Sequence, residues 1–396
     1  MGPATRYDVI VLGLGGMGSA ASCHLARRGA RVLGLDAFAR GHKNGSSHGR
    51  SRAIREAYAE SPRYVPLVQR AYALWRELEA ESGRRLLTIT GGISIGPAAP
   101  DFAASSKAAA AQYGLDVEEL SAAEIMARWP VFRLPAGHAG LFDPNAGCLL
   151  PEPCVAAHLD LAARHGADLH HGEPARRWSA DGAGIRVETD AGAYAAQSLV
   201  IAAGPWANEM LSDLHLPLDV LRMHTVYFVP SRPELFAPDR FPVWGLNAPE
   251  GTYYGMAIMQ PGDGLKVARH DKGEACTPRT ARRTVTSEEI AVARAVLDAT
   301  LPGAAGELLA AETCLYTMTP DGHFIVDRSP AHPNVVYACG FSGHGFKFAA
   351  AIGEVLADLA TAGTTRHDIG FLSASRFDGA RRFPSVRNGA VGQASM

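Results

Sequence analysis

The chain has 396 residues, of which 47% are hydrophobic and 20% are charged, so it carries enough apolar side chains for a large folded core. This composition excludes general disorder, and the length predicts two or three domains or one interleaved pair. Lysine and arginine number 38 against 40 acidic residues, and the formal net charge of -2 excludes a global basic field that would hold nucleic acid or an anionic membrane.

No apolar run in the sequence approaches the roughly 20 residues of a membrane-spanning helix. The first residues also lack the charged and apolar regions of a secretory signal, and we therefore expect a cytoplasmic protein. The cysteines are dispersed without the paired spacing of a zinc site, which predicts buried thiols and no metal centre. They are Cys23, Cys148, Cys154, Cys276, Cys314 and Cys339.

The first 36 residues carry the clearest pattern. Residues 7–12 form a short apolar run typical of a buried strand, and a glycine-rich turn at 13–18 leads into an alanine-rich helix over 19–28. A second predicted strand covers 31–35, and Asp36 follows it. This order of strand, glycine turn, helix and strand is typical of a domain that binds a dinucleotide.

Each glycine of the turn has a physical role in such a domain. Gly13 permits the tight turn, Gly15 lets the backbone approach a pyrophosphate, and Gly18 lets the helix pack on the strand. Asp36 lies 23 residues after Gly13, where a carboxylate accepts hydrogen bonds from ribose hydroxyls. The pattern predicts a cofactor that contains ADP, and it suits FAD and NAD equally.

The rest of the chain alternates between helix-like and strand-like patterns. Helices are predicted over 62–83, 101–128 (with breaks) and 287–301, and strands over 86–95, 185–189, 220–230 and 252–269. Two further strand-to-glycine junctions, at 198–206 and 334–345, resemble the one at the start of the chain.

Because cofactor-type junctions recur at the start, middle and end, one contiguous cofactor domain does not fit. We predict a discontinuous cofactor domain formed by 1–85, 146–216 and 318–390. A substrate domain built on an antiparallel sheet takes 86–145 and 217–317. The predicted fold class is α/β with mixed α+β character and a Rossmann-like cofactor domain.

Several longer motifs resemble the monomeric sarcosine oxidase and N-methyltryptophan oxidase family of flavoproteins, over nearly the whole length. They are His42–Gly49, Arg52–Arg55, Tyr253–Gly255, Gly264–Lys266, Cys314–Thr317, His323–Asp327 and Gly340–Phe348. The resemblance implies FAD as cofactor and an architecture like that of glutathione reductase and p-hydroxybenzoate hydroxylase. It also implies a monomer that oxidises the carbon–nitrogen bond of a secondary amino acid and reduces O2 to hydrogen peroxide.

The resemblance assigns roles to two residues in particular. Cys314 matches the cysteine that holds FAD covalently through the 8α-methyl group, and since the thiolate is the reactive form, we expect nearby charge to lower its pKa. Lys266 matches a lysine above the flavin that activates O2. Without the resemblance, we would expect Cys314 to be a buried structural thiol and Lys266 to be a charged side chain exposed to solvent.

By the same resemblance, Arg55 and Lys347 bind the substrate carboxylate, one as a bidentate fork and the other as a point charge. Arg52 matches a second arginine near the flavin. Tyr254, His270 and Tyr316 match positions that line the substrate cavity, and we assign none of them as an obligatory base.

The complete set expected to hold the cofactor combines the glycine turn with the matched motifs. It comprises Gly13, Gly15, Gly18, Asp36, Ser46, His48, Arg52, Cys314, Gly343, His344, Gly345 and Lys347. A helix N-terminus after Gly345 is expected to stabilise negative charge on the cofactor.

Several positions depart from the family pattern. Ser47 stands where close relatives commonly have His, and Arg50 where they have Asp. Met256-Ala257 replaces a frequent Phe-Pro, and Ala268-Arg269 replaces the usual Gly-Tyr before the histidine. The altered pocket leaves sarcosine itself open as the substrate and is compatible with a bulkier N-methylated or cyclic secondary amino acid.

Three other functions stay open from the sequence. One is a flavin dehydrogenase that uses an acceptor other than O2, against which Lys266 argues. Another is an NAD-dependent dehydrogenase, which the motif around Cys314 disfavours. The third is a flavin-binding protein without catalytic activity.

Overall fold

The computed structural model describes residues 5–181 and 184–378. Residues 1–4, 182–183 and 379–396, and with them part of the predicted cofactor domain, lie outside the described residues. No helix within these described ranges combines the length and apolar character that a membrane crossing needs.

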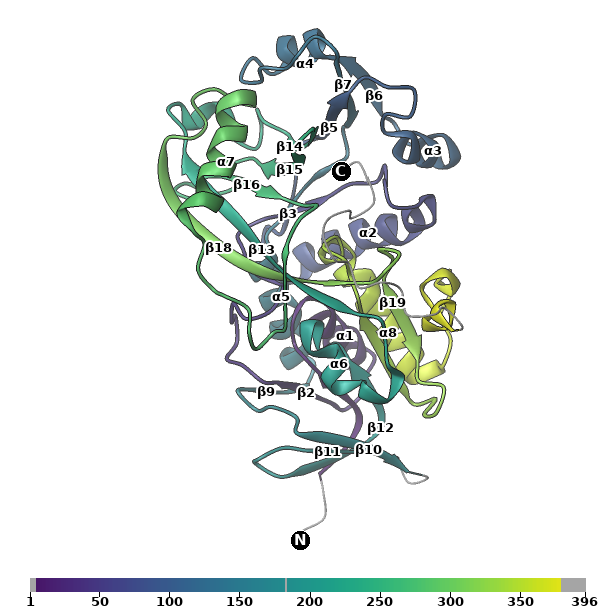
Figure 1. Cartoon of the computed structure of the whole chain (residues 1–396). Coiled ribbons are helices and arrows are strands. Elements are labelled where there is room, and N and C mark those ends of the chain that lie inside the picture. Colours follow the sequence, from purple (N-terminus) through teal and green to yellow (C-terminus); the bar gives the residue numbers. More distant parts are fainter. Residues whose placement is uncertain (1–4, 182–183, 379–396) are drawn as a thin grey trace.

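An eight-stranded sheet, called sheet A, forms the lower part of the elongated molecule in Figure 1. Its central strands run parallel in the order β9-β2-β1-β12-β20, and β11 pairs with β12 in the antiparallel sense. The strands are β1 (Thr5–Leu12), β2 (Val32–Asp36), β9 (Asp168–His171), β10 (Arg177–Asp181), β11 (Gly184–Glu188), β12 (Ala193–Ile201), β19 (Ile325–Arg328) and β20 (Val335–Cys339).

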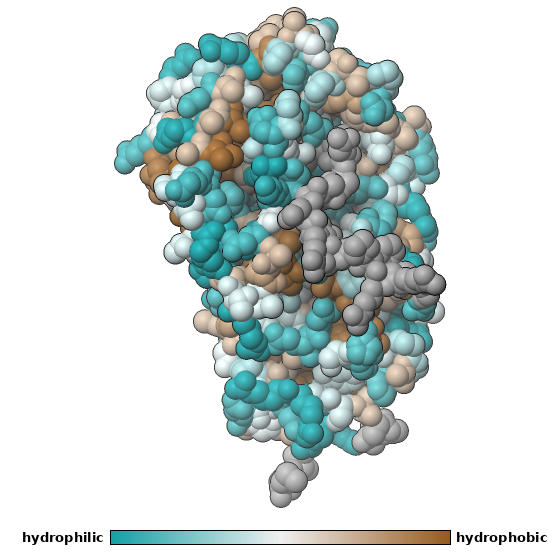
Figure 2. Space-filling view, viewed as in Figure 1, coloured by the Kyte–Doolittle hydropathy of each residue, from teal (hydrophilic) through white to brown (hydrophobic). Residues whose placement is uncertain are grey.

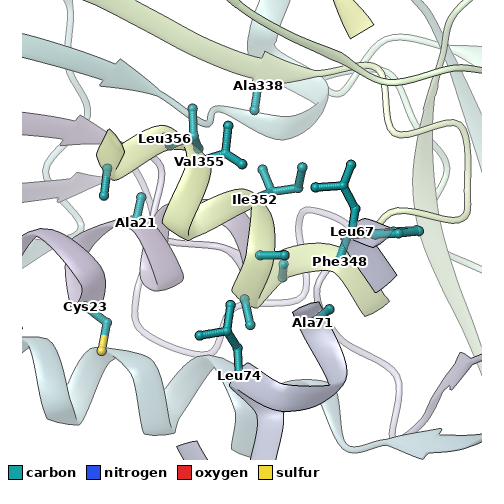
Figure 3. Close-up of a cluster of buried hydrophobic side chains, with 14 of the residues drawn as sticks. Ala21, Cys23, Leu67, Ala71, Leu74, Ala338, Phe348, Ile352, Val355 and Leu356 are labelled. Carbon is teal, nitrogen blue, oxygen red and sulfur yellow. The ribbon is translucent and has the colours of Figure 1, made fainter. Parts of the chain in front are cut away.

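Four helices pack in the layer beside this sheet. They are α1 (Gly16–Arg27), α2 (Val65–Ser82), α5 (Pro151–Arg164) and α8 (Ala349–Ala362). Figure 3 shows apolar side chains of α8, such as Ile352 and Val355, in one buried cluster with Leu67, Ala71 and Leu74 of α2. A Cβ atom at Gly353 would lie 2.4 Å from the Cβ atom of Ala20, so the close crossing of α8 and α1 requires glycine there.

This arrangement confirms the predicted α/β class and the Rossmann-like unit. Strand β1, a glycine turn, helix α1 and strand β2 follow one another, and β1 and β2 are parallel neighbours. The helix begins at Gly16, three residues before the predicted start, because Gly16 and Gly18 already belong to its first turn, whereas Gly15 is its extended N-cap residue.

A nine-stranded sheet, called sheet C, forms the upper part of Figure 1. Its order is β17-β13-β16-β15-β14-β5-β7-β6, with β18 on β13, and only β14 and β5 pair in parallel. The strands are β5 (Gly92–Pro97), β6 (Glu118–Ser121), β7 (His138–Asp143), β13 (Asp219–Val229), β14 (Val243–Ala248), β15 (Gly251–Met256), β16 (Leu265–Arg269), β17 (Glu274–Cys276) and β18 (Glu307–Met318).

The remaining elements are short. A three-stranded sheet joins β3 (Arg52–Ile54), β8 (Gly147–Leu149) and β4 (Leu87–Ile89), and the other helices are α3 (Ala104–Tyr113), α4 (Ala122–Arg128), α6 (Ala207–Met210) and α7 (Ser287–Thr300). Exposed apolar side chains gather on α7 and β18, where Figure 2 shows hydrophobic colour at the upper left.

Two predicted elements are divided in the structure. The strand predicted over 86–95 is split between β4 and β5, which belong to different sheets, and Gly91 at the break has a φ of 70°. The helix predicted over 101–128 becomes α3, β6 and α4, because Gly114 in the left-handed conformation ends α3 and a capping box at Ser121 starts α4.

The chain passes several times between the two large sheets. Sheet A draws its strands from 5–36, 168–201 and 325–339, and sheet C draws its strands from 92–143 and 219–318. The division into two discontinuous domains stays a prediction.

Candidate active site

One face of sheet C carries the side chains that the sequence singled out. Cys314 lies opposite Met223, and two pairs further along the same face Tyr227 lies opposite Lys266. Lys266 in turn lies opposite Met256 on β15. Because residues directly opposite each other point to the same side and every second residue shares a face, Tyr316 and Tyr254 also lie on this face.

This face borders a cavity of about 830 Å³ that extends to the glycine turn of sheet A. Most of the predicted site residues line it, namely Gly13, Gly15, Asp36, Ser46, His48, Arg52, Arg55, Tyr254, His270, Cys314, Tyr316, Gly343, His344, Gly345 and Lys347. Gly18 and Lys266 do not line it. Gly18 instead packs against the turn, and Lys266 lies behind the segment 49–52.

The glycine turn is a backbone cradle at the sheet A end of the cavity. Gly13 has a φ of 88°, and a Cβ atom there would lie 2.5 Å from the carbonyl oxygen of Ala202. A Cβ atom at Gly18 would overlap the carbonyl oxygen of Gly13 at 1.7 Å. Ser47, one of the departures from the family pattern, accepts a hydrogen bond at Oγ from the Gly16 N–H at 2.9 Å. These contacts require glycine and leave the turn backbone open to a ligand.

Asp36 lies at the end of β2 on the same side of the cavity. Its carboxylate accepts hydrogen bonds from the N–H groups of Leu14 at 2.8 Å and Phe38 at 2.9 Å. Burial raises the pKa of Asp36, but His42 and the two N–H groups outweigh it, and the net pKa lies below the usual value. The group is therefore an anionic acceptor at the point where the sequence predicts ribose binding.

Cys314 is held in place by its neighbours in the chain. His48 Nε2 bonds to the carbonyl oxygen of Thr313 at 2.9 Å, and the Ser46 hydroxyl donates to the carbonyl oxygen of Leu315 at 2.5 Å. The thiol lines the cavity between these two bonds. His48 Nδ1 is buried and finds no partner among the described residues, so it is available to a ligand in the cavity.

The expected low pKa of Cys314 was wrong. Burial raises the pKa of this thiol above its usual value, and the nearby charges of Arg52 and Lys266 oppose the rise without reversing it. Sequence reasoning identified a cationic surrounding, but it could not weigh that surrounding against complete burial.

Arg52 organises the segment before it. Its guanidinium donates to the carbonyl oxygen of Ser51 at 2.9 Å and to that of Ser46 at 3.1 Å, and it also bonds to the carbonyl oxygen of His48. Lys266 is 1% exposed and donates from Nζ to the carbonyl oxygen of Ser51 at 2.8 Å. Burial and the charge of Arg52 lower the pKa of Lys266 to about 7.

Arg55 and Lys347 meet in the cavity beside a carboxylate that sequence reasoning missed. Glu60 accepts from Arg55 Nη2 at 3.0 and 3.2 Å. Lys347 donates from Nζ to the carbonyl oxygen of His344 at 2.8 Å. Burial raises the pKa of Glu60, but the charges of Arg55, His344 and Lys347 hold it at about 2. No pattern in the sequence marked Glu60.

The charges of this cluster do not balance. Two cations, Arg55 and Lys347, face one carboxylate, Glu60, when all three are ionised. Burial and the charge of Arg55 lower the pKa of Lys347 to about 7. A buried excess of positive charge is costly, so the cluster fits one further anion such as a ligand carboxylate.

Tyr254, His270 and Tyr316 are neutral hydrogen-bonding groups near pH 7. Burial lowers the pKa of His270 to about 4 and raises the pKa values of Tyr254 and Tyr316. The Tyr316 hydroxyl lies 3.4 Å from His270 Nδ1, and the ring centroids of Tyr254 and His270 lie 6.2 Å apart. These groups are suited to orienting a ligand rather than to carrying charge.

The segment 340–348 closes the cavity near Lys347. The ring of Tyr316 covers Gly343, where a Cβ atom would lie 2.3 Å from Tyr316 Cε2. His344 bonds from Nδ1 to the hydroxyl of Tyr58 at 2.6 Å and from Nε2 to the carbonyl oxygen of Gly322 at 3.0 Å. Both ring nitrogens of His344 are thus occupied, and its carbonyl oxygen holds Lys347.

Comparison with known proteins identifies the family. A family model described as FAD dependent oxidoreductase matches residues 8–359. The chain belongs to this FAD-dependent oxidoreductase family. FAD fits the observed cavity, because the glycine cradle and the Asp36 acceptor are groups that a dinucleotide cofactor requires, and the buried His48 Nδ1 without a partner among the described residues offers one more polar contact.

Two groups of curated relatives cover nearly the whole chain. A monomeric sarcosine oxidase of Streptomyces avermitilis is 45% identical over 374 residues, which are 93% of this chain and 97% of the relative. An N-methyl-L-tryptophan oxidase of Salmonella newport is 36% identical over 375 residues, which are 94% of this chain and 99% of the relative. The resemblance predicted from the motifs is confirmed.

Solved structures agree in fold. NikD, an amino acid oxidase of nikkomycin biosynthesis, superposes with a TM-score of 0.83 at 26% identity over 93% of this chain and 97% of NikD. L-proline dehydrogenase from P. horikoshii reaches a TM-score of 0.82 at 22% identity over 95% of this chain and 98% of its own, which shows a shared fold.

The excess charge of the cluster predicts pH-dependent binding of a carboxylate. A small acid such as propionate should bind more weakly as the pH rises through about 7, because Lys347 then loses its proton. Above that pH, binding must take up a proton, so the affinity should fall by up to about tenfold per pH unit. The measurement is a titration of the flavin-loaded protein, followed through the absorbance of the flavin.

Two variants serve as controls for this titration. Lys347→Met should bind propionate weakly at every pH, whereas Lys266→Met should retain the pH dependence of the unmodified protein. An affinity that is constant across the range would contradict the assignment of the excess charge to Lys347.

Proposed function

We propose that this chain is an FAD-dependent oxidase of a secondary amino acid, either N-methylated or cyclic. It oxidises the carbon–nitrogen bond to an imine, which water hydrolyses, and O2 is reduced to hydrogen peroxide. The observation that carries this proposal is the buried cationic cluster of Arg55 and Lys347 in the same cavity as the glycine cradle and Cys314. The names of the curated relatives support it.

The residues divide the work as follows. Arg55 and Lys347 bind the substrate carboxylate, and Tyr254, His270 and Tyr316 orient the rest of the molecule. Bound FAD supplies the acceptor of the two electrons that leave the carbon–nitrogen bond.

Lys266 supplies a positive charge beside the place where O2 is reduced. A fixed cation in a site of low dielectric stabilises the negative charge that O2 gains as it is reduced. Its Nζ lies 5.8 Å from the ring centroid of Tyr254, and that ring lines the cavity.

A second, smaller cavity supports a substrate larger than sarcosine. It measures about 40 Å³ and shares Ala53, Arg55 and Tyr254 with the large cavity. Its floor on sheet C carries the small residues Ser94 and Gly245. Because this space adjoins Arg55 and Tyr254, we assign it to a small substituent of the substrate.

The function is tested by anaerobic mixing with candidate amines, followed by readmission of oxygen. Sarcosine, N-methylalanine, L-proline and L-pipecolate should each be compared for the rate at which they bleach the flavin. We expect at least one of the three larger amines to bleach the flavin faster than sarcosine does. We also expect hydrogen peroxide to form when oxygen is readmitted. Bleaching without peroxide formation would indicate a dehydrogenase. The absence of bleaching by every amine would indicate a flavin-binding protein without catalytic activity.

A variant separates substrate size from the chemistry. Gly245→Leu fills the small cavity and should slow bleaching by the larger amines while sarcosine still reacts. Equal slowing of all amines would exclude this cavity as the place of the substituent.

We propose that FAD is attached covalently through the thiol of Cys314. The bond from the Cys314 sulfur to the 8α carbon would replace one C–H bond of that carbon, so the thiol and the carbon would each lose a proton, and the flavin would take up the two electrons and pass them to O2. The nearby charges of Arg52 and Lys266 favour deprotonation of the thiol against the effect of burial. Acid-precipitated protein should therefore stay yellow, and Cys314→Ala should release its flavin under the same treatment. Cys339→Ala, which removes another buried thiol, should keep the colour. Release of all flavin from the unmodified protein by acid would refute the attachment.

The role proposed for Lys266 is tested by separating the two half-reactions. Lys266→Met should slow reoxidation of the reduced flavin by O2 by at least about tenfold, because the cation is lost from a buried site. Reduction by substrate should change much less. Stopped-flow absorbance measures both rates, and an equal fall in the two would exclude a specific role with O2.

A further inference from the structure

A strained turn lies between the cofactor motif and β3. The N–H of Ser51 donates to the carbonyl oxygen of Gly49 at 2.7 Å, which closes a three-residue γ-turn with Arg50 at its centre. Arg50 has a φ of 61°. This form of γ-turn is rare and strained for a residue with a side chain, so surrounding contacts must hold it.

Contacts from three other elements hold this turn. Glu152 of α5 accepts from the Gly49 N–H at 2.7 Å, and the hydroxyl of Tyr227 on β13 donates to the Gly49 carbonyl oxygen at 2.9 Å. Arg50 itself reaches the segment before β16, where its Nη1 donates to the carbonyl oxygen of Asp263 at 2.6 Å. Its guanidinium also lies 4.5 Å from the ring centroid of Tyr227.

The turn brings two carbonyl oxygens to one ammonium group. Lys266 Nζ donates to the carbonyl oxygen of Ser51 at 2.8 Å and to that of Gly49 at 3.4 Å. In an extended strand, residues two apart are separated by roughly 6.5 Å, too far for one nitrogen to bond both carbonyl groups. The γ-turn shortens this separation, and the buried ammonium gains two acceptors for its three N–H donors.

We propose that the strained turn Gly49–Ser51 is a positioning device for Lys266, and that Arg50 is the positioning residue that latches the turn in place. This proposal rests on the role of Lys266 proposed above. The turn fixes where Nζ lies beside the site and stabilises its charged form by two carbonyl dipoles. The residue that latches it is one at which this chain departs from the family pattern.

Other groups also act on the charge of Lys266. Arg52 lies nearest and disfavours the protonated form, while the thiols and the carboxylate on neighbouring elements favour it. The groups that face Lys266 are Arg52, Cys148, Glu152, Tyr227, Tyr254 and Cys314. Replacement of Arg50 leaves all six residues in the chain, and among them it removes a direct contact only from the ring of Tyr227.

The sign of one pKa change tests the proposal. Removal of the positive charge of Arg50 by itself would raise the pKa of Lys266, through lower repulsion. Loss of the contacts that Arg50 makes with Asp263 and Tyr227 should lower the pKa of Lys266 instead, because the relaxed turn no longer presents both carbonyl groups to Nζ. We therefore expect Arg50→Ala to lower the pKa of Lys266 by about 1, the value of one hydrogen bond to a charged group.

The chain offers a direct measurement, since it contains only five lysines, Lys43, Lys107, Lys266, Lys272 and Lys347. Flavin-loaded protein with 13C-labelled lysine gives one Cε resonance for each, and Lys266→Met assigns the relevant one. Its chemical shift followed against pH gives the pKa. Arg50→Lys should keep the pKa near that of the unmodified protein.

Arg269→Ala is the matched control. Arg269 pairs with Asp271 at 2.9 Å and lies 5.7 Å from the ring centroid of Tyr253, but it does not touch the turn. This variant should leave the pKa of Lys266 unchanged. If Arg50→Ala does not fold, Arg50→Gln carries the same test with the same expected sign.

A second readout links the turn to the reaction. The pH at which reoxidation by O2 declines should move downward in Arg50→Ala by the same amount as the pKa, with reduction by substrate unchanged. A raised or unchanged pKa of Lys266 in the folded variant would overturn the proposal. Normal reoxidation of Lys266→Met would instead overturn the role of Lys266, and the resonance would still decide whether the turn positions it.

Discussion

Buried positive charge is the constraint on which the candidate site depends. Arg52, Arg55, Lys266 and Lys347 all have little contact with water, and each must recover the hydration that it loses. Arg52 and Lys266 recover it from backbone carbonyl oxygens of the segment 46–51. Arg55 has a carboxylate, Glu60, and Lys347 has the carbonyl oxygen of His344. The cavity can keep an excess of positive charge only because the backbone around it turns its carbonyl groups inward.

The same constraint explains the irregular backbone near the site. A regular strand through 46–55 would place alternate carbonyl groups on opposite sides, and Arg52 and Lys266 would compete for half of them. Left-handed conformations at Gly49, Arg50 and Ser342 direct these segments instead. The strain is local, and the strands of sheet C pair regularly around Cys314 and Tyr254; the register shift between β13 and β18 lies at Tyr227 and Phe228. A rigid sheet and a bent segment thus meet across one cavity.

The sequence was sufficient for the parts that regular patterns determine. The glycine turn, β1, α1 and Asp36 follow from short-range periodicity and spacing, and the structure has them where expected. Nearly all of the site residues that the motifs predicted line one cavity in the structure. Glu60 was not predicted as a site residue because a single carboxylate in a loop belongs to no sequence motif. Its role follows only from its ion pair with Arg55, which the fold creates.

Charge balance was the other property that spacing could not supply. The pKa of Cys314 depends on how completely the thiol is buried relative to Arg52 and Lys266, and burial is a property of the whole fold. The position of Lys266 behind the turn has the same origin. Its neighbours on β16 indicate which face it occupies, but a γ-turn at a residue as ordinary as Arg50 leaves no signal in the sequence.

Burial of the site has a consequence for the chemistry of the substrate amine. A secondary amine in water is mostly protonated near pH 7, and the protonated form has no lone pair from which oxidation can begin. In the proposed complex the ligand carboxylate balances the excess charge of the cluster, so the protonated amine is disfavoured mainly by its removal from water, as burial disfavours the charged forms of His270 and Lys347. His270, Tyr254 and Tyr316, all neutral there, then need only to accept or donate hydrogen bonds. On the function proposed above, the burial that lowers the pKa of Lys347 would also favour the neutral, reactive form of the amine, and these three groups would only have to orient it.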